Sequence, residues 1–109
     1  MQENIAIINK DTQTPLASGL EGEHVRLFEG AWYFEREAVD MTDLIVTERV
    51  YICPYKGRCY WIDLKTAVST HQNVAFTYFE TSPGYEFIQH RIGFYAGERE
   101  ATLEKITQP

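Results

Sequence analysis

A tight turn between two aromatic segments restricts the fold of this chain more than any other feature. Pro54 fixes its own backbone φ angle and Gly57 tolerates a positive φ, so the residues from one to the other are predicted to turn sharply. The flanking segments, residues 50–52 and 59–62, are aromatic and β-branched, which favours pleated, half-buried strands. We therefore predict an antiparallel hairpin in the central sheet, with Lys56 near its tip and largely buried rings beside it.

Other short runs of apolar and aromatic residues, separated by turn residues, predict further strands over residues 24–28, 31–34, 61–65, 74–79 and 91–95. Residues 35–44 and 85–88 break the alternation and are expected to form short helical turns, and residues 69–73 are expected to form a polar turn. An aromatic content of 14% also favours a β-rich fold with a thin core. The sequence therefore predicts a mainly β protein, built as an antiparallel sandwich, barrel or bent two-sheet fold.

The two ends of the chain carry weaker signals than its middle. We interpret residues 1–21 as an N-terminal segment, in which the apolar run 5–8 forms an edge strand or docks loosely and residues 18–22 form a linker-like loop. Residues 22–100 are expected to form the β domain. Residues 101–109 are expected to add an edge strand or a partly ordered tail.

The charge balance limits the partners that the chain can have. A net charge of −6 and a pI near 5.0 argue against binding to a long nucleic acid, which requires a basic stripe, but a local cation cluster can still bind a small anion. No apolar run approaches the roughly 20 residues of a membrane helix, and the first residues lack the basic region of a secretory signal. We therefore expect a cytoplasmic protein without a membrane partner, either a monomer or a dimer.

The cysteines and histidines do not predict a metal site. A structural zinc site needs four ligands, commonly in closely spaced pairs, whereas Cys53 and Cys59 are six positions apart and the three histidines are scattered. No metal or other cofactor is expected. Cys53 is either a nucleophile activated by nearby cations or a small core residue, and the absence of a histidine close to it in sequence favours the core residue. A Cys53–Cys59 disulfide is geometrically conceivable, but a reducing cytoplasm disfavours it.

The turn itself is the best candidate for a binding element. Lys56 next to Gly57 can present an ammonium group and backbone N–H groups to a phosphate or carboxylate. Arg36 can complete such a pocket as an anion clamp, with Glu37 as its orienter or as a general base. The stacking wall would come from Tyr55, Trp61 or Trp32. The alternative is that Lys56 is an ordinary turn residue and that Arg36 and Glu37 lie on the surface.

Four segments of the chain resemble the family catalogued as domain of unknown function 427: Tyr33–Val39, Cys53–Gly57 with Tyr60 and Trp61, Ala75–Tyr78, and Ile92–Tyr95. The C-P-Y-K-G turn with its aromatic sequel is the specific part, and the chain departs from the pattern at Glu35 and Phe76, where proline and tryptophan are usual. The resemblance implies a small β-tent-like fold of two sheets and carries a nucleotidyltransferase-like label without a mechanism. Tyr78 and Cys53, from the matching segments, complete the candidate ligand-binding set.

Two functions remain open at this point. The first is a domain that binds, and in an enzyme would also transform, a small anionic or nucleotide-like ligand near the hairpin. The second is a non-catalytic module that meets a protein partner through an aromatic surface. A pocket shared by Lys56, Arg36 and an aromatic ring would favour the first function, and a flat exposed aromatic patch would favour the second.

Overall fold

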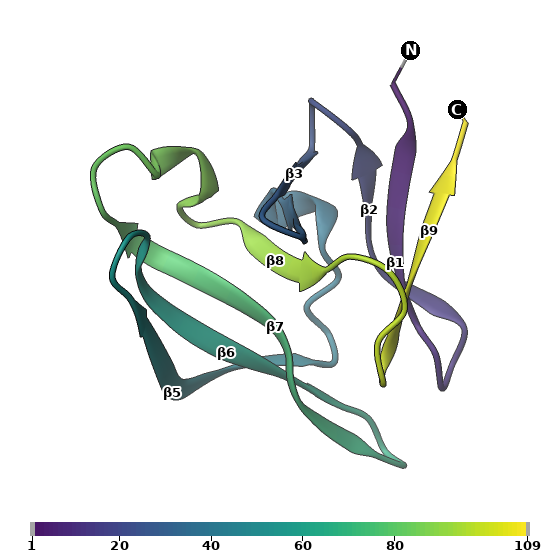
Figure 1. The fold of residues 1–109 in the computed structure, drawn as a ribbon. Helices are drawn as coiled ribbons and strands as arrows, with labels where there is room; N and C mark the ends of the chain where they lie inside the picture. The colour runs from purple at the N-terminus through teal and green to yellow at the C-terminus, as the bar shows by residue number, and fades with distance from the viewer. Residues whose placement is uncertain (1, 109) are drawn as a thin grey trace.

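Two antiparallel β-sheets make up the structure, a computed structural model that describes residues 2–108 (Figure 1). The larger sheet has six strands in the order β3-β4-β8-β7-β6-β5, and the smaller sheet has three in the order β2-β1-β9. The elements are β1 Asn4–Asn9, β2 Thr14–Leu20, β3 Val25–Phe28, β4 Ala31–Phe34, η1 Arg36–Ala38, β5 Leu44–Cys53, β6 Gly57–Lys65, β7 Thr70–Thr81, η2 Glu86–Ile88, β8 Ile92–Tyr95 and β9 Thr102–Thr107, where η denotes a 3₁₀ turn. The mainly β, two-sheet prediction is confirmed. No helix within residues 2–108 is long and apolar enough to cross a membrane.

The smaller sheet joins the two ends of the chain, which lie side by side in Figure 1. Its middle strand is β1, which pairs with β2 on one side and with β9 on the other, and the side chains of Ile5 and Ile7 are fully buried. The expectation of an edge strand or a loosely docked segment at residues 5–8 was therefore wrong, whereas β9 is the expected edge strand. The loop expected at residues 18–22 was also wrong for its first three residues, which belong to β2. Gly19 serves close packing there, because a Cβ atom on it would lie 2.6 Å from Cβ of His24.

The predicted hairpin is present as β5 and β6, and its register pairs Tyr51 with Cys59 and Cys53 with Gly57. β6 lies inside the larger sheet, but β5 is its edge strand. Tyr51 is therefore 54% exposed and Tyr55, in the turn, is 71% exposed. The prediction that the rings of the hairpin are largely buried was wrong for these two residues, because no strand among residues 2–108 covers the outer side of β5.

Most of the remaining local predictions are confirmed, and the differences lie at the two ends of β7. η1 and η2 lie within the two segments expected to form helical turns, and β3 and β4 form the expected hairpin. β7 begins earlier than predicted, because Thr70 already pairs with Lys65 of β6. The polar turn expected at residues 69–73 was therefore wrong for residues 70–73, which belong to β7; the turn lies at residues 66–69, where the Thr66 N–H donates to the Ser69 carbonyl.

Both faces of the larger sheet bury apolar side chains, which the alternation along β4 shows directly. Trp32 and Phe34 belong to the inner core, which packs against the smaller sheet and comprises Ile5, Ile7, Leu16, Ala17, Val25, Trp32, Phe34, Leu44, Ile62, Leu64, Ala75, Ile92, Phe94 and Ala101. Ala31 and Tyr33 belong to a separate aromatic cluster, which comprises Ala31, Tyr33, Cys59, Phe76, Tyr78 and Ile88 with Phe28, Trp61, Tyr85, Phe87 and Tyr95 at its border.

Candidate functional site

The aromatic cluster surrounds a cavity of about 340 Å³. This volume lies near the lower end of the range of small-molecule sites, which is roughly 300–1,000 Å³. Five strands of the larger sheet and two hairpin turns contribute the lining residues Glu29, Ala31, Tyr33, Tyr51, Lys56, Cys59, Trp61, Phe76, Tyr78 and Tyr95. We call this hollow the aromatic cavity.

The backbone of the β5–β6 turn holds Lys56 in a fixed position. Its N–H donates a hydrogen bond to Sγ of Cys53 over 3.3 Å, and its carbonyl accepts one from the Ser82 N–H over 2.9 Å. Gly57 follows with φ +119°, and a Cβ atom there would lie 2.9 Å from the Glu80 carbonyl oxygen. The C-P-Y-K-G segment therefore shapes the turn that places Lys56 beside the cavity.

The Lys56 ammonium group lies in a mostly buried, aromatic environment. Its side chain is only 17% exposed, and Nζ is 5.8 Å from the ring centroid of Phe28 and 5.9 Å from that of Tyr78. Oε1 of Glu29 pairs with it over 2.8 Å. Glu29 comes from the two-residue β3–β4 turn, where it and Gly30 both have positive φ, so the ion pair joins two hairpin tips at the cavity.

The other polar groups of the aromatic cavity are neutral at pH 7. Burial raises the pKa of the Cys59 thiol to about 11, so this cysteine is not a thiolate nucleophile at neutral pH. Burial also raises the pKa of Tyr33, of Tyr78 and of Tyr95, so their hydroxyls keep their protons. The cavity therefore combines neutral rings, hydroxyls and a thiol with a single ion pair.

The structure brings together three of the seven candidate residues from the sequence. Lys56, Trp61 and Tyr78 line the aromatic cavity. Cys53 is buried beneath the turn, where its sulfur accepts the hydrogen bond described above, as expected of a core residue. Tyr55 points to solvent.

Arg36 and Glu37 are also outside the cavity lining, so the expected surface shared by Arg36 and Lys56 is not present. Both residues are exposed on η1, and η1 lies beside β2 of the smaller sheet. The following residues, Ala38 and Val39, pack on the inner core, which carries this segment away from the aromatic cluster.

Sequence reasoning missed most of the aromatic wall. Tyr33 of β4 and Tyr95 of β8 enter the cavity because these strands pair with each other and β8 pairs with β7, a long-range arrangement that no local pattern reveals. One local signal was present in Gly93. A Cβ atom there would lie 2.4 Å from Cε2 of Phe76, so this glycine leaves room for a cavity-lining ring.

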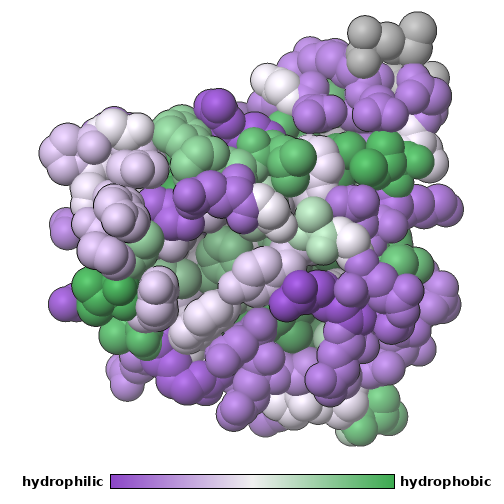
Figure 2. Space-filling view, viewed as in Figure 1, coloured by the Kyte–Doolittle hydropathy of each residue, from purple (hydrophilic) through white to green (hydrophobic). Residues whose placement is uncertain are grey.

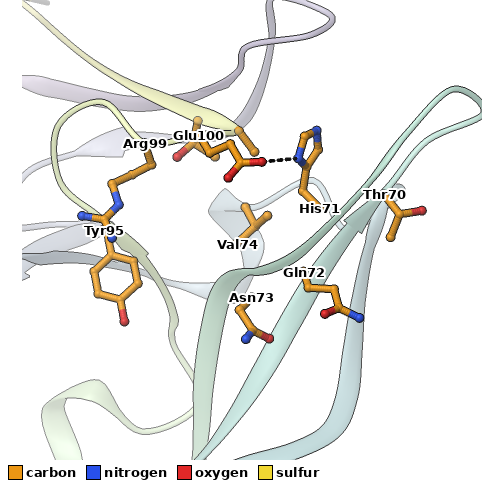
Figure 3. Close-up of a pocket in the computed structure, with 10 residues that line it drawn as sticks. Thr70, His71, Gln72, Asn73, Val74, Tyr95, Arg99 and Glu100 are labelled. Atoms are coloured by element: carbon orange, nitrogen blue, oxygen red, sulfur yellow. Dashed lines mark ion pairs between the residues drawn. The ribbon is translucent and has the colours of Figure 1, made fainter.

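A second hollow of about 600 Å³, which we call the cleft, lies between the first part of β7 and the loop that joins β8 to β9 (Figure 3). Its lining residues are Thr70, His71, Gln72, Asn73, Val74, Tyr95, Arg99, Glu100, Ala101 and Thr102. Within residues 2–108, no group of three histidine, cysteine or acidic side chains is arranged to hold a metal ion in either hollow.

A comparison with models of protein families identifies a family that covers most of the chain. The family described as a domain of unknown function, DUF427, with the label NTP_transf_9, matches residues 22–105. This range includes every residue that lines the aromatic cavity. No curated protein matches the chain.

Proposed function

The chain belongs to the family described as domain of unknown function 427. We propose that its aromatic cavity binds a small planar ligand that carries an acidic group, as a nucleotide does. The observation that carries the proposal is a mostly buried ammonium group, that of Lys56, at the wall of a hollow lined by rings. Lysines are almost never fully buried unless they are paired, and the partner of Lys56, Glu29, is itself 57% exposed.

The lining matches the chemistry of such a ligand. The planar part of a ligand can lie against Trp61 and Phe76, whose rings pack edge to face with their centroids 5.9 Å apart. The neutral tyrosine hydroxyls can donate hydrogen bonds to the ligand or accept them from it. Lys56 can donate to an acceptor atom of the ligand, because Glu29 is exposed enough to move aside. These groups support binding rather than a particular reaction. Cys59 is a neutral thiol and hence no nucleophile at pH 7, and the family label assigns no catalytic residue.

The proposal is tested by a screen of planar metabolites, with thermal stability as the first measurement and calorimetry for those that raise it, since a ligand of the native state stabilises it. Lys56→Met should weaken each such ligand about ten- to hundredfold, the effect of losing one hydrogen bond to a charged group. Lys65→Met, on the exposed end of β6, is the matched control and should bind like the parent. Equal affinity of the parent and Lys56→Met for every ligand would place the site elsewhere.

The exposed edge of the larger sheet favours a second candidate, a non-catalytic interaction module. Ile45, Val50, Tyr51 and Ile52 of β5 are all exposed, and Figure 2 shows apolar residues at the surface on the left, the side on which β5 lies in Figure 1. This candidate becomes the better one if the screen yields no ligand that depends on Lys56.

A further inference from the structure

Tyr95 belongs to the walls of both hollows. Along β7 the cleft-lining residue Val74 packs on the inner core and the cavity-lining residue Phe76 belongs to the aromatic cluster, so the side chain that the two hollows share is that of Tyr95. In Figure 3 the ring of Tyr95 stands at one end of the cleft and His71 stands toward the other, with Val74 between them. The Tyr95 ring therefore stands at the boundary between the aromatic cavity and the cleft.

The charges of the two hollows differ. In the aromatic cavity the ammonium of Lys56 is matched by the carboxylate of Glu29, and the remaining lining groups are neutral. In the cleft, Cζ of Arg99 lies 4.6 Å from the ring centroid of Tyr95. No carboxylate of the described residues lies within ion-pair distance of the Arg99 guanidinium. Arg99 is thus an exposed cation beside the shared wall that forms no ion pair with another described residue.

The loop holds the backbone of Arg99 in place. The Arg99 N–H donates to the Thr102 carbonyl over 2.8 Å, and the Arg99 carbonyl accepts a hydrogen bond from Nζ of Lys10 over 3.2 Å. Lys10 also pairs with Glu98 over 2.7 Å. Two hydrogen bonds therefore hold the Arg99 backbone, and the Lys10–Glu98 ion pair holds the lysine that makes one of them. From this position the guanidinium stacks on Tyr95.

At the other end of the cleft, the lining residue His71 contacts two acidic side chains, Asp11 and the lining residue Glu100. Asp11 accepts hydrogen bonds from His71 over 2.9 Å and from Ser69 over 3.1 Å, and these bonds lower the pKa of Asp11, so it is a carboxylate at pH 7. Nε2 of His71 must then carry a proton, and Nδ1 faces Glu100 at 3.9 Å. The Glu100 side chain is mostly in solvent and turns toward His71 rather than Arg99, as Figure 3 shows.

We propose that the cleft is the acid-binding subsite for the ligand of the aromatic cavity: the planar body lies in the cavity, and a carboxylate or phosphate attached to it reaches past Tyr95 to Arg99. This inference rests on the proposed function and adds to it the place and the partner of the acidic group. A guanidinium stacked on a ring keeps its N–H groups in one plane, which suits two parallel hydrogen bonds to either kind of acid.

The test uses two pairs of probes that differ only in the acid. Uridine 5′-monophosphate is compared with uridine, and indole-3-propionate is compared with indole-3-propanol, by calorimetry on the full chain. The parent should bind at least one acid roughly tenfold or more tightly than its neutral analogue, the gain expected of a charge-assisted pair of hydrogen bonds. Which pair shows the preference identifies the acid as phosphate or carboxylate.

The variant Arg99→Gln should abolish this preference and leave the affinity for the neutral analogue unchanged. Arg36→Gln, at an exposed arginine of η1 that lines neither hollow, should keep the preference. A preference that survives in Arg99→Gln, or one that Lys56→Met removes instead, would overturn the subsite. Acids that need Arg99 but bind Lys56→Met as tightly as the parent would refute the proposed function alone, and no binding of either acid to the parent would refute both.

Discussion

The two faces of the larger sheet are made by alternate residues of the same strands, yet one face is a closed core and the other surrounds a cavity. On the inner-core face, Phe34 and Phe94 pack edge to face with centroids 5.9 Å apart, and the smaller sheet covers them. On the aromatic face, no second sheet is present within residues 2–108, and the covering segments are turns and η2. A sheet face closed by another sheet becomes solid packing, whereas rigid rings bordered only by turns leave a hollow in which Lys56 can sit.

The largest expected effect comes from opening the closed face. Phe94→Ala should lower the free energy of unfolding by about 3–5 kcal/mol, because the fully buried ring leaves a cavity that the two sheets cannot collapse to fill. Urea denaturation of this variant and of Phe79→Ala, a half-exposed ring of β7, checks it. If the two variants lose the same stability, the inner core does not carry the fold as described.

A smaller effect is expected from crowding the open face. Gly93→Ala places a methyl group where the Phe76 ring now lies, and the ring can move only toward the aromatic cavity. We expect a loss of about 1–3 kcal/mol in stability, as for other overpacked sites, together with weaker binding of any ligand that requires Lys56. Full stability with unchanged binding in Gly93→Ala would show that the ring is not confined.

The smallest effect concerns the proton of the Cys59 thiol, which is buried on the aromatic face. Burial raises the pKa of Cys59 from about 9 to about 11, so above pH 9 the unfolded chain binds fewer protons than the native one, and stability must fall as the pH rises through this window. The slope for one group is at most about 1.4 kcal/mol per pH unit. Denaturation at pH 7 and pH 10 should show a smaller loss in Cys59→Ala than in the parent. If the free energy of unfolding falls equally in both proteins between pH 7 and pH 10, Cys59 is not the group responsible.

The sequence predicts the local parts of this comparison. The register of the β5–β6 hairpin follows from Pro54, Gly57 and the alternation beside them, and Lys56 with Trp61 follows from that hairpin. The sequence could not show that β4, β8 and β7 are neighbours, so it did not bring Tyr33 and Tyr95 to the cavity.

The wrong predictions share the same cause. Arg36 was assigned to the site because it resembles part of the family's polar segment, but packing of Ala38 and Val39 on the inner core carries η1 away. The run at residues 5–8 was read as an edge or a loosely docked segment because its second partner, β9, is about a hundred residues distant from β1. Strand pairing over such separations depends on the whole fold rather than on a local pattern.

The two tryptophans provide the most direct test, because each reports on one face. Trp61 lines the aromatic cavity, and Trp32 lies in the inner core with its indole N–H donated to Glu104. In a nitrogen-edited NMR titration with the acid probe that binds best, the indole signal of Trp61 should shift while that of Trp32 stays in place. A shift of the Trp32 signal without one of Trp61 would contradict the assignment of ligand binding to the aromatic face.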